Sequence, residues 1–384
     1  MTVKLGSLIS EYTVRNKADE DIPVYSVTNE QGFCTGYFSK EVASQDRTTY
    51  KIVPRGCFAY NPSRINVGSV DVQECEDRVI VSPLYVVFSV DEKLNRRYLL
   101  HYLKSDITLT YIKAYASGSV RDNLKFSILK DFPINLPSTE EQKQIVATLD
   151  GIDHLIGLRK EELSSLDELV KSRFIELFGD PLINEKGWTV SKLGEYMTLL
   201  TDFSSNGSYE LLDSNVVMYD EPNYAIMVRT TDLESGNLSD GVKYIDRNAY
   251  ELLAKSKIYG GELIMNKIGS AGKIYVMPKI DRPASLGRNA FMFRFDERLN
   301  MTYLYSFLTS DYGTAEIQQY VRGAVTKTIT KESTRSIRII VPPIALQEQF
   351  AAFVEQADKS KLAVQKALDE LEILKKSLMQ QYFG

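Results

Sequence analysis

The amino-acid sequence predicts an α+β protein, in which two similar mixed α/β domains are separated by two long helices that pair as an antiparallel coiled coil with a pseudo-twofold internal repeat. The first observation is that the chain of 384 residues repeats its own pattern. The second is that each copy of the repeat ends in a long amphipathic stretch. The third is that the rest of the chain consists of short β-type runs broken by turn residues. A hydrophobic content of 43% is typical of a folded chain.

The repeat is clearest when residues 115–179 are written over residues 320–384, an offset of 205 positions. This alignment needs no gap and is identical at 16 of 65 positions. A short helix is predicted near residues 96–104 and again near residues 301–309, so the repeat begins well before the long amphipathic stretches. Near the start of each copy, Lys4-Leu5-Gly6 matches Lys192-Leu193-Gly194 at an offset of 188. The second copy is therefore 17 residues longer, and we expect the addition between residues 202 and 222, as a polar surface loop.

Each long stretch reads as one helix of roughly 40 residues, which at about 1.5 Å per residue extends for about 60 Å. The first helix has a start signal after Pro137, because Ser138 can cap free backbone N–H groups while Glu141 reaches back, as in a capping box. A helix of this length needs a partner for its apolar side, and the second copy provides one. The apolar stripes comprise Ile145, Leu149, Ile152, Ile156, Leu163, Leu166 and Val170 in the first helix, and Phe350, Val354, Ala357, Val364, Leu368, Leu371 and Leu378 in the second.

These patterns divide the chain into four segments. Residues 1–136 form the first mixed domain, and residues 137–180 form the first long helix. Residues 181–341 form the second mixed domain, and residues 342–384 form the second long helix. The order is therefore domain, helix, domain, helix, and each repeat is far larger than the module of a solenoid protein.

Charge and cysteine content narrow the function classes. The net charge is −5, which argues against indiscriminate binding of nucleic acid, but the acidic excess lies in residues 131–180, with 5 basic and 11 acidic residues. Three cysteines and two histidines without paired spacing make a zinc site or a disulfide framework improbable. The sequence has no apolar run of bilayer length and no secretory signal, so we expect a cytoplasmic protein without a membrane partner.

Two short polar segments occupy matching places in the two domains and are the main candidates for a binding site. Asn and Arg side chains can pair with base edges, whereas Lys, Ser and backbone N–H groups hold phosphates. A plain hairpin turn would use the same residue types, and the sequence does not separate the two readings. The candidate residues are Asn61, Ser63, Arg64 and Asn66 in the first segment, and Asn266, Lys267, Ser270 and Lys273 in the second. Weaker candidates elsewhere are Arg121, Lys125, Arg229, Thr230, Arg288, Asn289 and Lys327.

Two segments of the sequence partly resemble enzyme motifs, but neither contains the residues that the motif requires. Asn61-Pro62-Ser63-Arg64 begins like the Asn-Pro-Pro-Tyr motif of DNA adenine methyltransferases, but it lacks the second proline and the aromatic residue that holds a flipped base. The segment from Gly269 to Lys273 has two residues between its glycines where a phosphate-binding loop has four, and Ile274 replaces the hydroxyl residue that binds magnesium. No catalytic triad, pair of catalytic carboxylates or cofactor fingerprint can be assembled. This pattern favours binding over catalysis.

The chain as a whole resembles the specificity subunit of type I restriction–modification systems over nearly its entire length. The doubled order of domain and helix carries the resemblance more specifically than any single motif does. The residues that support it are Leu136-Pro137 with residues 141–145, residues 166–178, Val341-Pro342 with Gln347-Glu348-Gln349, residues 371–383, Gly118-Ser119 and residues 56–68.

The resemblance implies that each mixed domain is a target-recognition domain, which reads one half of a split, asymmetric site in double-stranded DNA. It implies that the paired helices fix the distance between the halves and dock two methylation subunits. The acidic excess of the first helix also suits a protein-binding face better than a DNA contact. The helix residues expected to serve partner binding are Gln142, Gln144, Leu166, Phe178, Gln347, Gln349, Leu371 and Phe383.

The resemblance also implies that this chain is not itself an enzyme and binds no cofactor or metal. S-adenosylmethionine is expected in the methylation subunits, and ATP with Mg in nuclease and translocase subunits of a full complex. An alternative reading is a non-catalytic coiled-coil scaffold that presents two protein-binding domains, because the same architecture could space two protein ligands.

Overall fold

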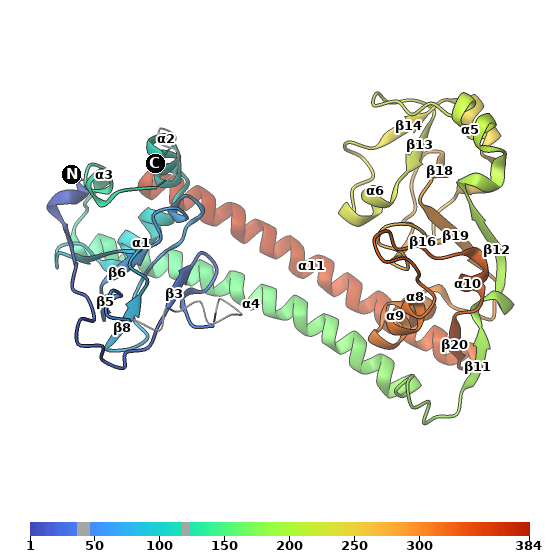
Figure 1. The fold of residues 1–384 in the computed structure, drawn as a ribbon, viewed down its shortest axis with the longest axis horizontal. Coiled ribbons are helices and arrows are strands. Elements are labelled where there is room, and N and C mark those ends of the chain that lie inside the picture. The colour runs from blue at the N-terminus through green and yellow to red at the C-terminus, as the bar shows by residue number, and fades with distance from the viewer. Residues whose placement is uncertain (37–46, 117–122) are drawn as a thin grey trace. The chain divides into compact units, whose positions relative to one another are not determined.

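The computed structural model describes residues 1–36, 47–116 and 123–384. The chain divides into two compact units, unit 1 with Met1–Leu163 and Ala363–Gly384, and unit 2 with Ser164–Leu362. The two long helices predicted from the stripes are α4 (Thr139–Phe178) and α11 (Ile344–Phe383), each of 40 residues (Figure 1). Each unit therefore contains a part of α4 and a part of α11.

The two long helices pack together in opposite directions within each unit. In unit 1 the ammonium of Lys375 in α11 lies 2.5 Å from a carboxylate oxygen of Asp153 in α4. In unit 2 the ammonium of Lys361 lies 2.6 Å from a carboxylate oxygen of Asp167. Residues of the predicted stripes are buried between the helices, since Leu149 of α4 shares an apolar cluster with Phe383 of α11, and Phe350 of α11 shares another with Phe174 of α4. The predicted antiparallel coiled coil is confirmed, and the fold is the expected α+β arrangement.

Unit 1 carries its mixed domain before α4. Its largest sheet has the strand order β2-β9-β6-β7, and two-stranded sheets pair β1 with β10, β3 with β4, and β5 with β8. The strands are β1 (Thr2–Lys4), β2 (Ile9–Glu11), β3 (Ser26–Thr28), β4 (Gly32–Cys34), β5 (Lys51–Pro54), β6 (Phe58–Tyr60), β7 (Val70–Val72), β8 (Arg78–Val81), β9 (Val86–Val90) and β10 (Pro133–Asn135). The helices are α1 (Arg96–Lys104), α2 (Asp106–Ala116) and α3 (Phe126–Leu129), with 3-10 turns η1 (Leu5–Ser7) and η2 (Ile65–Val67).

Unit 2 repeats the same plan between α4 and α11. It has one sheet with the order β12-β19-β16-β17, a second with the order β14-β13-β18-β15, and the pair β11-β20. The strands are β11 (Thr189–Lys192), β12 (Met197–Asp202), β13 (Ala225–Val228), β14 (Lys243–Ile245), β15 (Lys257–Ile258), β16 (Leu263–Asn266), β17 (Ile274–Val276), β18 (Ala284–Leu286), β19 (Ala290–Phe295) and β20 (Arg338–Val341). The helices are α5 (Tyr209–Asn215), α6 (Thr230–Ser235), α7 (Arg247–Leu252), α8 (Met301–Thr309), α9 (Asp311–Gln318) and α10 (Lys331–Arg335), with 3-10 turns η3 (Leu193–Glu195), η4 (Phe203–Asn206) and η5 (Ala254–Ser256).

The short helices predicted at matching places are α1 and α8, and both have the predicted bounds. The 17-residue addition differs from the expected loop, because residues 202–222 contain η4 and α5. Leu212 and Val216 at this place are buried in a cluster with Ala249 and Met227. These two apolar residues hold the addition against the second sheet. Their burial was not predicted from the sequence, because most of the neighbouring residues are polar.

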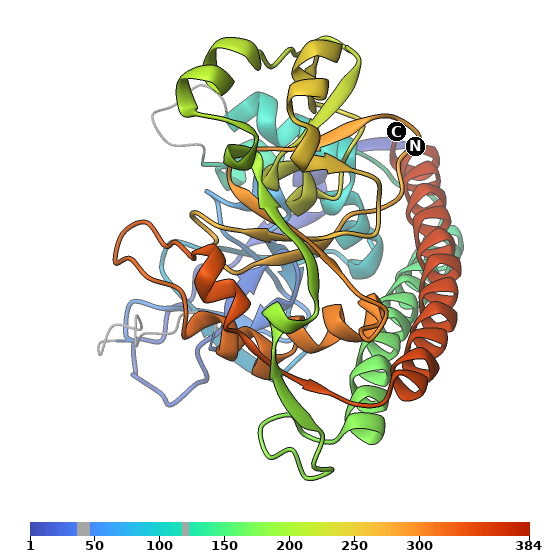
Figure 2. The ribbon, with the colours of Figure 1, turned by 90° about the vertical axis from the view of Figure 1, so that its right-hand side faces the viewer.

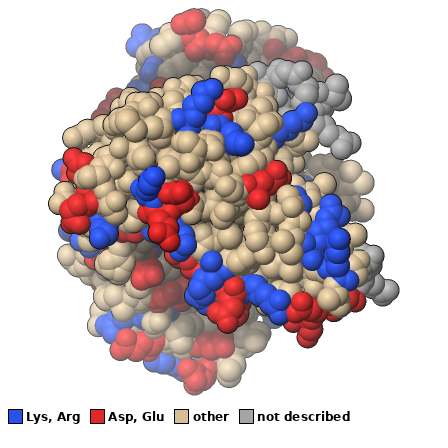
Figure 3. All heavy atoms as spheres, turned by 90° about the vertical axis from the view of Figure 1, so that its left-hand side faces the viewer, with Lys and Arg blue, Asp and Glu red and all other residues tan. Residues whose placement is uncertain are grey.

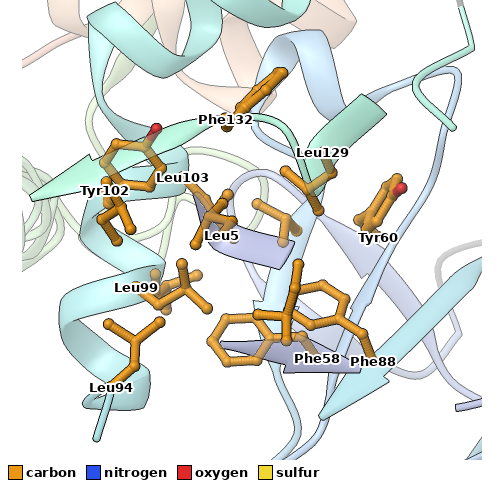
Figure 4. Packing of buried hydrophobic residues seen from close by; sticks show 14 of the residues in the cluster. Leu5, Phe58, Tyr60, Phe88, Leu94, Leu99, Tyr102, Leu103, Leu129 and Phe132 are labelled. Carbon is orange, nitrogen blue, oxygen red and sulfur yellow. The ribbon is translucent and has the colours of Figure 1, made fainter. Parts of the chain in front are cut away.

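The core of unit 1 lies between its largest sheet and α1, as Figure 4 shows. Phe58 and Phe88 stack with ring centroids 5.0 Å apart on the sheet, and Leu99 of α1 points towards them. The end of α11 completes this core, because the ring of Phe383 lies 5.1 Å from that of Tyr98. In unit 2 the end of α4 does the same, with Phe178 4.7 Å from the ring of Tyr303. The two aromatic residues are therefore core anchors, buried in their own units and not available to a partner.

A buried glutamine ties each long helix to the mixed domain that precedes it. The Gln142 side chain accepts a hydrogen bond from the backbone N–H of Asn95 at 2.7 Å and donates to the carbonyls of Lys93 and Pro137. Gln347 makes the same three contacts, with the N–H of Asn300 at 2.8 Å and the carbonyls of Arg298 and Pro342. Both glutamines are fully buried. A buried side chain cannot contact a separate subunit, so these residues hold the helix to its own unit instead of docking a partner.

The remaining residues that were expected to bind a partner lie nearer the surface. Gln144 and Gln349 are exposed, and Leu166 and Leu371 are half-buried in the helix pairs. The start signal of α4 is confirmed as well. The backbone N–H of Ser138 donates to a carboxylate oxygen of Glu141 at 2.8 Å, and the Ser138 hydroxyl accepts from the N–H of Glu141 at 3.3 Å.

Candidate DNA interface

The first candidate segment is the β6–β7 loop, residues 61–69 of unit 1. Asn61 begins it with an Asx turn, because its side-chain oxygen accepts from the N–H of Ser63 at 3.1 Å and from the Ser63 hydroxyl at 3.0 Å. Gly68 ends the 3-10 turn with a φ of 87°, which suits glycine. Asn66 lies half-buried in that turn. The segment is therefore a turn, as one interpretation of the sequence expected. The same turn also exposes polar side chains, as the DNA-binding interpretation expected.

The structure brings Lys125 to this loop from a distant part of the sequence. The N–H of Leu124 donates to the carbonyl of Pro62 at 3.0 Å, and the Tyr60 hydroxyl donates to the carbonyl of Leu124 at 3.1 Å. Lys125 follows directly and is exposed. Arg121 lies outside the described residues.

A cleft of about 430 Å³ lies beside the β6–β7 loop. Asn61 and Arg64 line one side, and residues 27–31, at the turn between β3 and β4, line the other. The hairpin is held there by the Ser69 hydroxyl, which donates to the carbonyl of Val27 at 2.6 Å. Sequence reasoning missed Asn29, Glu30 and Gln31. Their polar, turn-rich pattern could have indicated them, but nothing in the sequence indicates that this turn faces Arg64.

The second candidate segment is the β16–β17 loop, residues 267–273 of unit 2, and it is built in the same way. The N–H of Ile329 donates to the carbonyl of Lys267 at 3.0 Å, at positions 205 residues after Leu124 and Pro62. The N–H of Gly269 donates to the carbonyl of Lys327 at 2.9 Å, and the N–H of Lys267 donates to the carbonyl of Asn289 at 2.9 Å. Three predicted segments therefore meet at one surface.

Not every candidate in the β16–β17 region faces solvent. Asn266 is 3% exposed, at the end of β16, so its side chain lies beneath the surface where a base edge would have to reach it. Lys267 is also occupied, with its ammonium 2.9 Å from a carboxylate oxygen of Asp202. These two residues therefore support the loop from below. Ser270, by contrast, is exposed at its tip.

Asp202 is the centre of a small charged cluster under the loop. Lys331 donates to its other carboxylate oxygen at 2.7 Å, and Ser205 donates to the same oxygen at 2.6 Å. Burial alone would raise the pKa of Asp202, but the hydrogen bonds from Lys331, Ser205 and Lys267 outweigh burial and hold the pKa far below its usual range. The carboxylate therefore stays charged at neutral pH and balances two lysines. Sequence reasoning missed Asp202 and Lys331, because they lie far from the loop in the chain.

Three further basic candidates of unit 2 have an acidic partner. Arg229 contacts Asp232, with two atoms 2.5 Å apart, and Arg288 lies 3.0 Å from Asp213. Lys273 pairs with Glu234, and this hydrogen bond raises the pKa of Lys273. Thr230 follows Arg229 at the start of α6 and is half-buried. The N–H of Gly287 donates to the carbonyl of Val228 at 2.8 Å, which brings the segments of Arg229 and Arg288 together.

Three basic candidates have no ion-pair or hydrogen-bond partner for their side chains within the described residues. They are Arg64 and Lys125 in unit 1, and Lys327 in unit 2, and all three are exposed. An unpaired cation can take a phosphate or a base edge without first losing a carboxylate. On the face that Figure 3 shows, basic and acidic side chains are interspersed among uncharged residues and form no continuous basic patch. On this face, individual side chains would therefore contribute more to DNA binding than a broad positive field would.

Comparison with known protein families decides the relationship of the chain. The model described as "Type I restriction modification DNA specificity domain" matches residues 5–168 and again residues 185–372. The chain belongs to this family. Each match covers one mixed domain and most of the long helix that follows it, so the two specificity domains coincide with the two copies of the internal repeat. No helix in the described part of this family member has the length and apolarity that a membrane crossing requires.

Curated relatives agree with the specificity-domain family. The chain is 24% identical over 293 residues to the "Type I restriction enzyme MjaVIII specificity subunit" of Methanocaldococcus jannaschii, covering 73% of this chain and 68% of the relative. It is 21% identical over 352 residues to the "Putative type I restriction enzyme MjaX specificity subunit" of the same organism, covering 89% of this chain and 80% of the relative. These alignments span both specificity domains of the present chain.

Solved structures share the fold of this family member. A chain from the study titled "Structural basis underlying complex assembly and conformational transition of the type I R-M system" superposes with a TM-score of 0.60 at 17% identity, covering 100% of this chain and 97% of that one. The "Type-I restriction-modification system S subunit from M. genitalium" gives a TM-score of 0.55 at 14% identity, covering 100% and 96%. At these identities the likeness concerns the fold.

Proposed function

We propose that this chain is the DNA-recognition subunit of a type I restriction–modification complex. Each mixed domain reads one half of a bipartite, asymmetric site in double-stranded DNA, and the chain itself catalyses no reaction. The two long helices set the spacing of the halves and dock two methylation subunits. S-adenosylmethionine belongs to those methylation subunits, and ATP with Mg belongs to nuclease and translocase subunits of the full complex.

The observation that carries this proposal is a loop built twice at equivalent positions in a chain that the family model also matches twice. The bond from Leu124 to Pro62 and the bond from Ile329 to Lys267 hold the two loops in the same way. The displayed residues nevertheless differ, with Arg64 in the first loop and Gly269 at the aligned position of the second. A shared frame with different side chains suits two readers of two different half-sites.

The presence of two recognition domains also explains how the chain could select a long DNA sequence although each domain alone would have limited sequence specificity. One small domain contacts only a few base pairs, whereas two joined readers multiply their discrimination and restrict the distance between the halves. The three unpaired cations provide few phosphate contacts, so we expect weak DNA binding by the isolated chain. Methylation subunits would then add the remaining electrostatic contacts to the phosphate backbone.

Two equivalent grooves support the docking of two partner subunits. In unit 2 a groove of about 920 Å³ lies between the C-terminal half of α4 and the start of α9, and it is lined by Lys171, Ile175 and Asp311 among others. In unit 1 a groove of about 310 Å³ lies between the end of α11 and the start of α2, and it is lined by Lys376 and Asp106 among others. Lys171 lies 205 positions before Lys376, and Asp311 lies 205 positions after Asp106, so the two grooves use matching positions of the repeat. We therefore place one methylation subunit at each groove.

The deciding experiment is expression of the chain with candidate methylation subunits, followed by mapping of methylated adenines across a bacterial genome. We expect methylation at one split, asymmetric sequence with a fixed spacer. A catalytically dead methylation subunit is the control for background methylation. Stable assembly without any sequence preference would contradict the proposal and favour the protein-binding scaffold.

A further inference from the structure

The segment between α9 and α10 carries an apolar side chain that folding does not explain. Val325 is 97% exposed, which is more than any other large apolar side chain in the described residues. Branched side chains are disfavoured in turns, and this one gains no burial in return. Figure 2 shows the segment, coloured orange-red, as a loop that projects from unit 2 before it leads into the short helix α10.

The position of Val325 is defined by the structure around it. Arg322 and Thr328 exchange two backbone hydrogen bonds of 2.9 and 2.7 Å and close a hairpin with residues 323–327 at its tip. Gly323 has a φ of 104°, and a Cβ there would lie 2.1 Å from the carbonyl oxygen of Thr326, so only glycine fits. The carbonyl of Lys327 also accepts from Gly269 in the β16–β17 loop. The hairpin is thus fixed to the candidate DNA interface of unit 2.

The surroundings of Val325 carry positive charge. Lys327 is exposed, and its side chain has no partner in the described part of the chain. Arg322 is exposed too, with its guanidinium held by the carbonyl oxygens of Gln319 at 2.5 Å and Val321 at 3.1 Å. An apolar tip between two cations suits a ligand that has a phosphate backbone and a small apolar group between its phosphates.

We propose that Val325 contacts the 5-methyl group of a thymine in the major groove of the half-site that unit 2 reads. The methyl group of thymine is the apolar group that base edges present in that groove. Lys327 and Arg322 would meet the flanking phosphates. The inference rests on the proposed function, under which each half-site contains an adenine to be methylated and therefore a thymine opposite it. Val120 stands at the matching position of the first repeat, outside the described residues.

The test uses the complex assembled with methylation subunits, after its site has been mapped. Each thymine of the half-site read by unit 2 is replaced in turn by uracil, which removes only the methyl group, and the dissociation constant is measured at one fixed salt concentration. The chain is compared with Val325→Thr, which keeps the shape but replaces a methyl group by a hydroxyl. Val217→Thr is the matched control, because Val217 is another exposed valine of unit 2, away from the hairpin.

We expect one uracil position to weaken binding by the unaltered complex about fourfold, the value of one buried methyl group. Val325→Thr, which keeps only one of the two methyl groups of valine, should bind the thymine site more weakly and should lose less affinity on replacement by uracil than the unaltered chain does. Val217→Thr should behave as the unaltered chain. Equal uracil effects in both variants, or no uracil effect at any position, would overturn the inference. Failure of Val325→Thr to assemble would also overturn it and indicate a protein contact. The proposed function itself fails earlier, if mapping finds no bipartite site.

Discussion

At the residue scale, the same residue type has different roles in the two copies of the loop. Asn61 shapes an open turn, whereas Asn266 at the aligned position lies buried at the end of a strand. Arg64 is exposed and has no side-chain partner among the described residues, whereas Arg229 and Arg288 are already paired with carboxylates. Residue type therefore indicates which contacts are chemically possible, but the neighbours decide which side chains are free to make them.

Arg64 gives a prediction for one half-site. Arg64→Ala should weaken binding by about 1 to 3 kcal/mol and relax the base preference at one position, because an unpaired guanidinium can make paired hydrogen bonds to guanine. Genome-wide methylation by the assembled complex would show relaxed sequence in only one half of the site. Arg55→Ala, another exposed arginine of unit 1 outside the cleft, is the control. Equal relaxation of both halves would count against separate readers.

Gln347 gives a prediction for stability. Gln347→Ala should lower the free energy of unfolding by about 2 to 4 kcal/mol, because it leaves the N–H of Asn300 and two carbonyl groups without partners in a buried place. Gln349→Ala, two residues further along α11 and exposed, should change it by less than about 0.5 kcal/mol. Urea unfolding of the whole chain measures both. If the two variants were equally stable, the attachment assigned to Gln347 would be wrong.

At the element scale, each long helix serves two units. The start of α4 joins the mixed domain of unit 1 through Gln142, and its end fills the core of unit 2 with Phe178. In the same way α11 begins in unit 2 with Gln347 and ends in unit 1 with Phe383. The helix ends are therefore parts of the cores, and the grooves beside α2 and α9 are the surfaces that we propose for partner docking.

The grooves give a prediction for assembly. Lys376→Glu should weaken the docking of one methylation subunit roughly tenfold, because it places a second negative charge beside Asp106 at the groove of unit 1. Lys171→Glu should do the same at the groove of unit 2. Native mass spectrometry of dilute complexes should then show one methylation subunit where the unaltered chain holds two. Lys143→Glu, exposed on α4 and outside both groove linings, is the control. Two bound subunits with both variants would exclude these grooves as docking sites.

At the scale of the whole molecule, the chain is a repeated unit whose two copies share the two long helices. The repeat accounts for the pairing of α4 with α11, because each copy provides one helix to a common pair. Under the proposed function, the length of that pair becomes a property of the DNA site, since the distance between two readers limits the distance between the sequences they read.

Helix length gives the prediction at this scale. Insertion of seven residues in each helix, after Leu163 in α4 and after Leu362 in α11, adds two turns and about 10 Å while nearly keeping the phase of the apolar stripe. The spacer of the methylated site should lengthen, by at most about 3 base pairs at 3.4 Å each. Insertion in α4 alone is the control and should disrupt assembly, because the stripes no longer match. A spacer unchanged by the double insertion would refute the role of the helices in spacing.

The sequence by itself determined the architecture of this protein and its place in a family. Repetition at a fixed offset, the apolar stripe and the alternation of β-type runs are local signals, and each is set by the chemistry of neighbouring residues. They were sufficient for α1, α8, α4, α11 and the pairing of the helices. The addition in residues 202–222 escaped this reasoning, because the two apolar residues that anchor its helix gain their meaning only from a distant sheet.

Only the tertiary structure decided which candidate side chains are accessible. Sequence spacing could not predict that Asp202 holds Lys267, that Asn266 and Gln347 are buried, or that the turn at Asn29 faces Arg64, because these contacts join residues far apart in the chain. Burial and charge pairing are properties of three-dimensional neighbours, and they separate free cations from occupied ones. Val325 could likewise be identified as a candidate contact only from the structure, because only the structure shows that this apolar side chain is exposed to solvent.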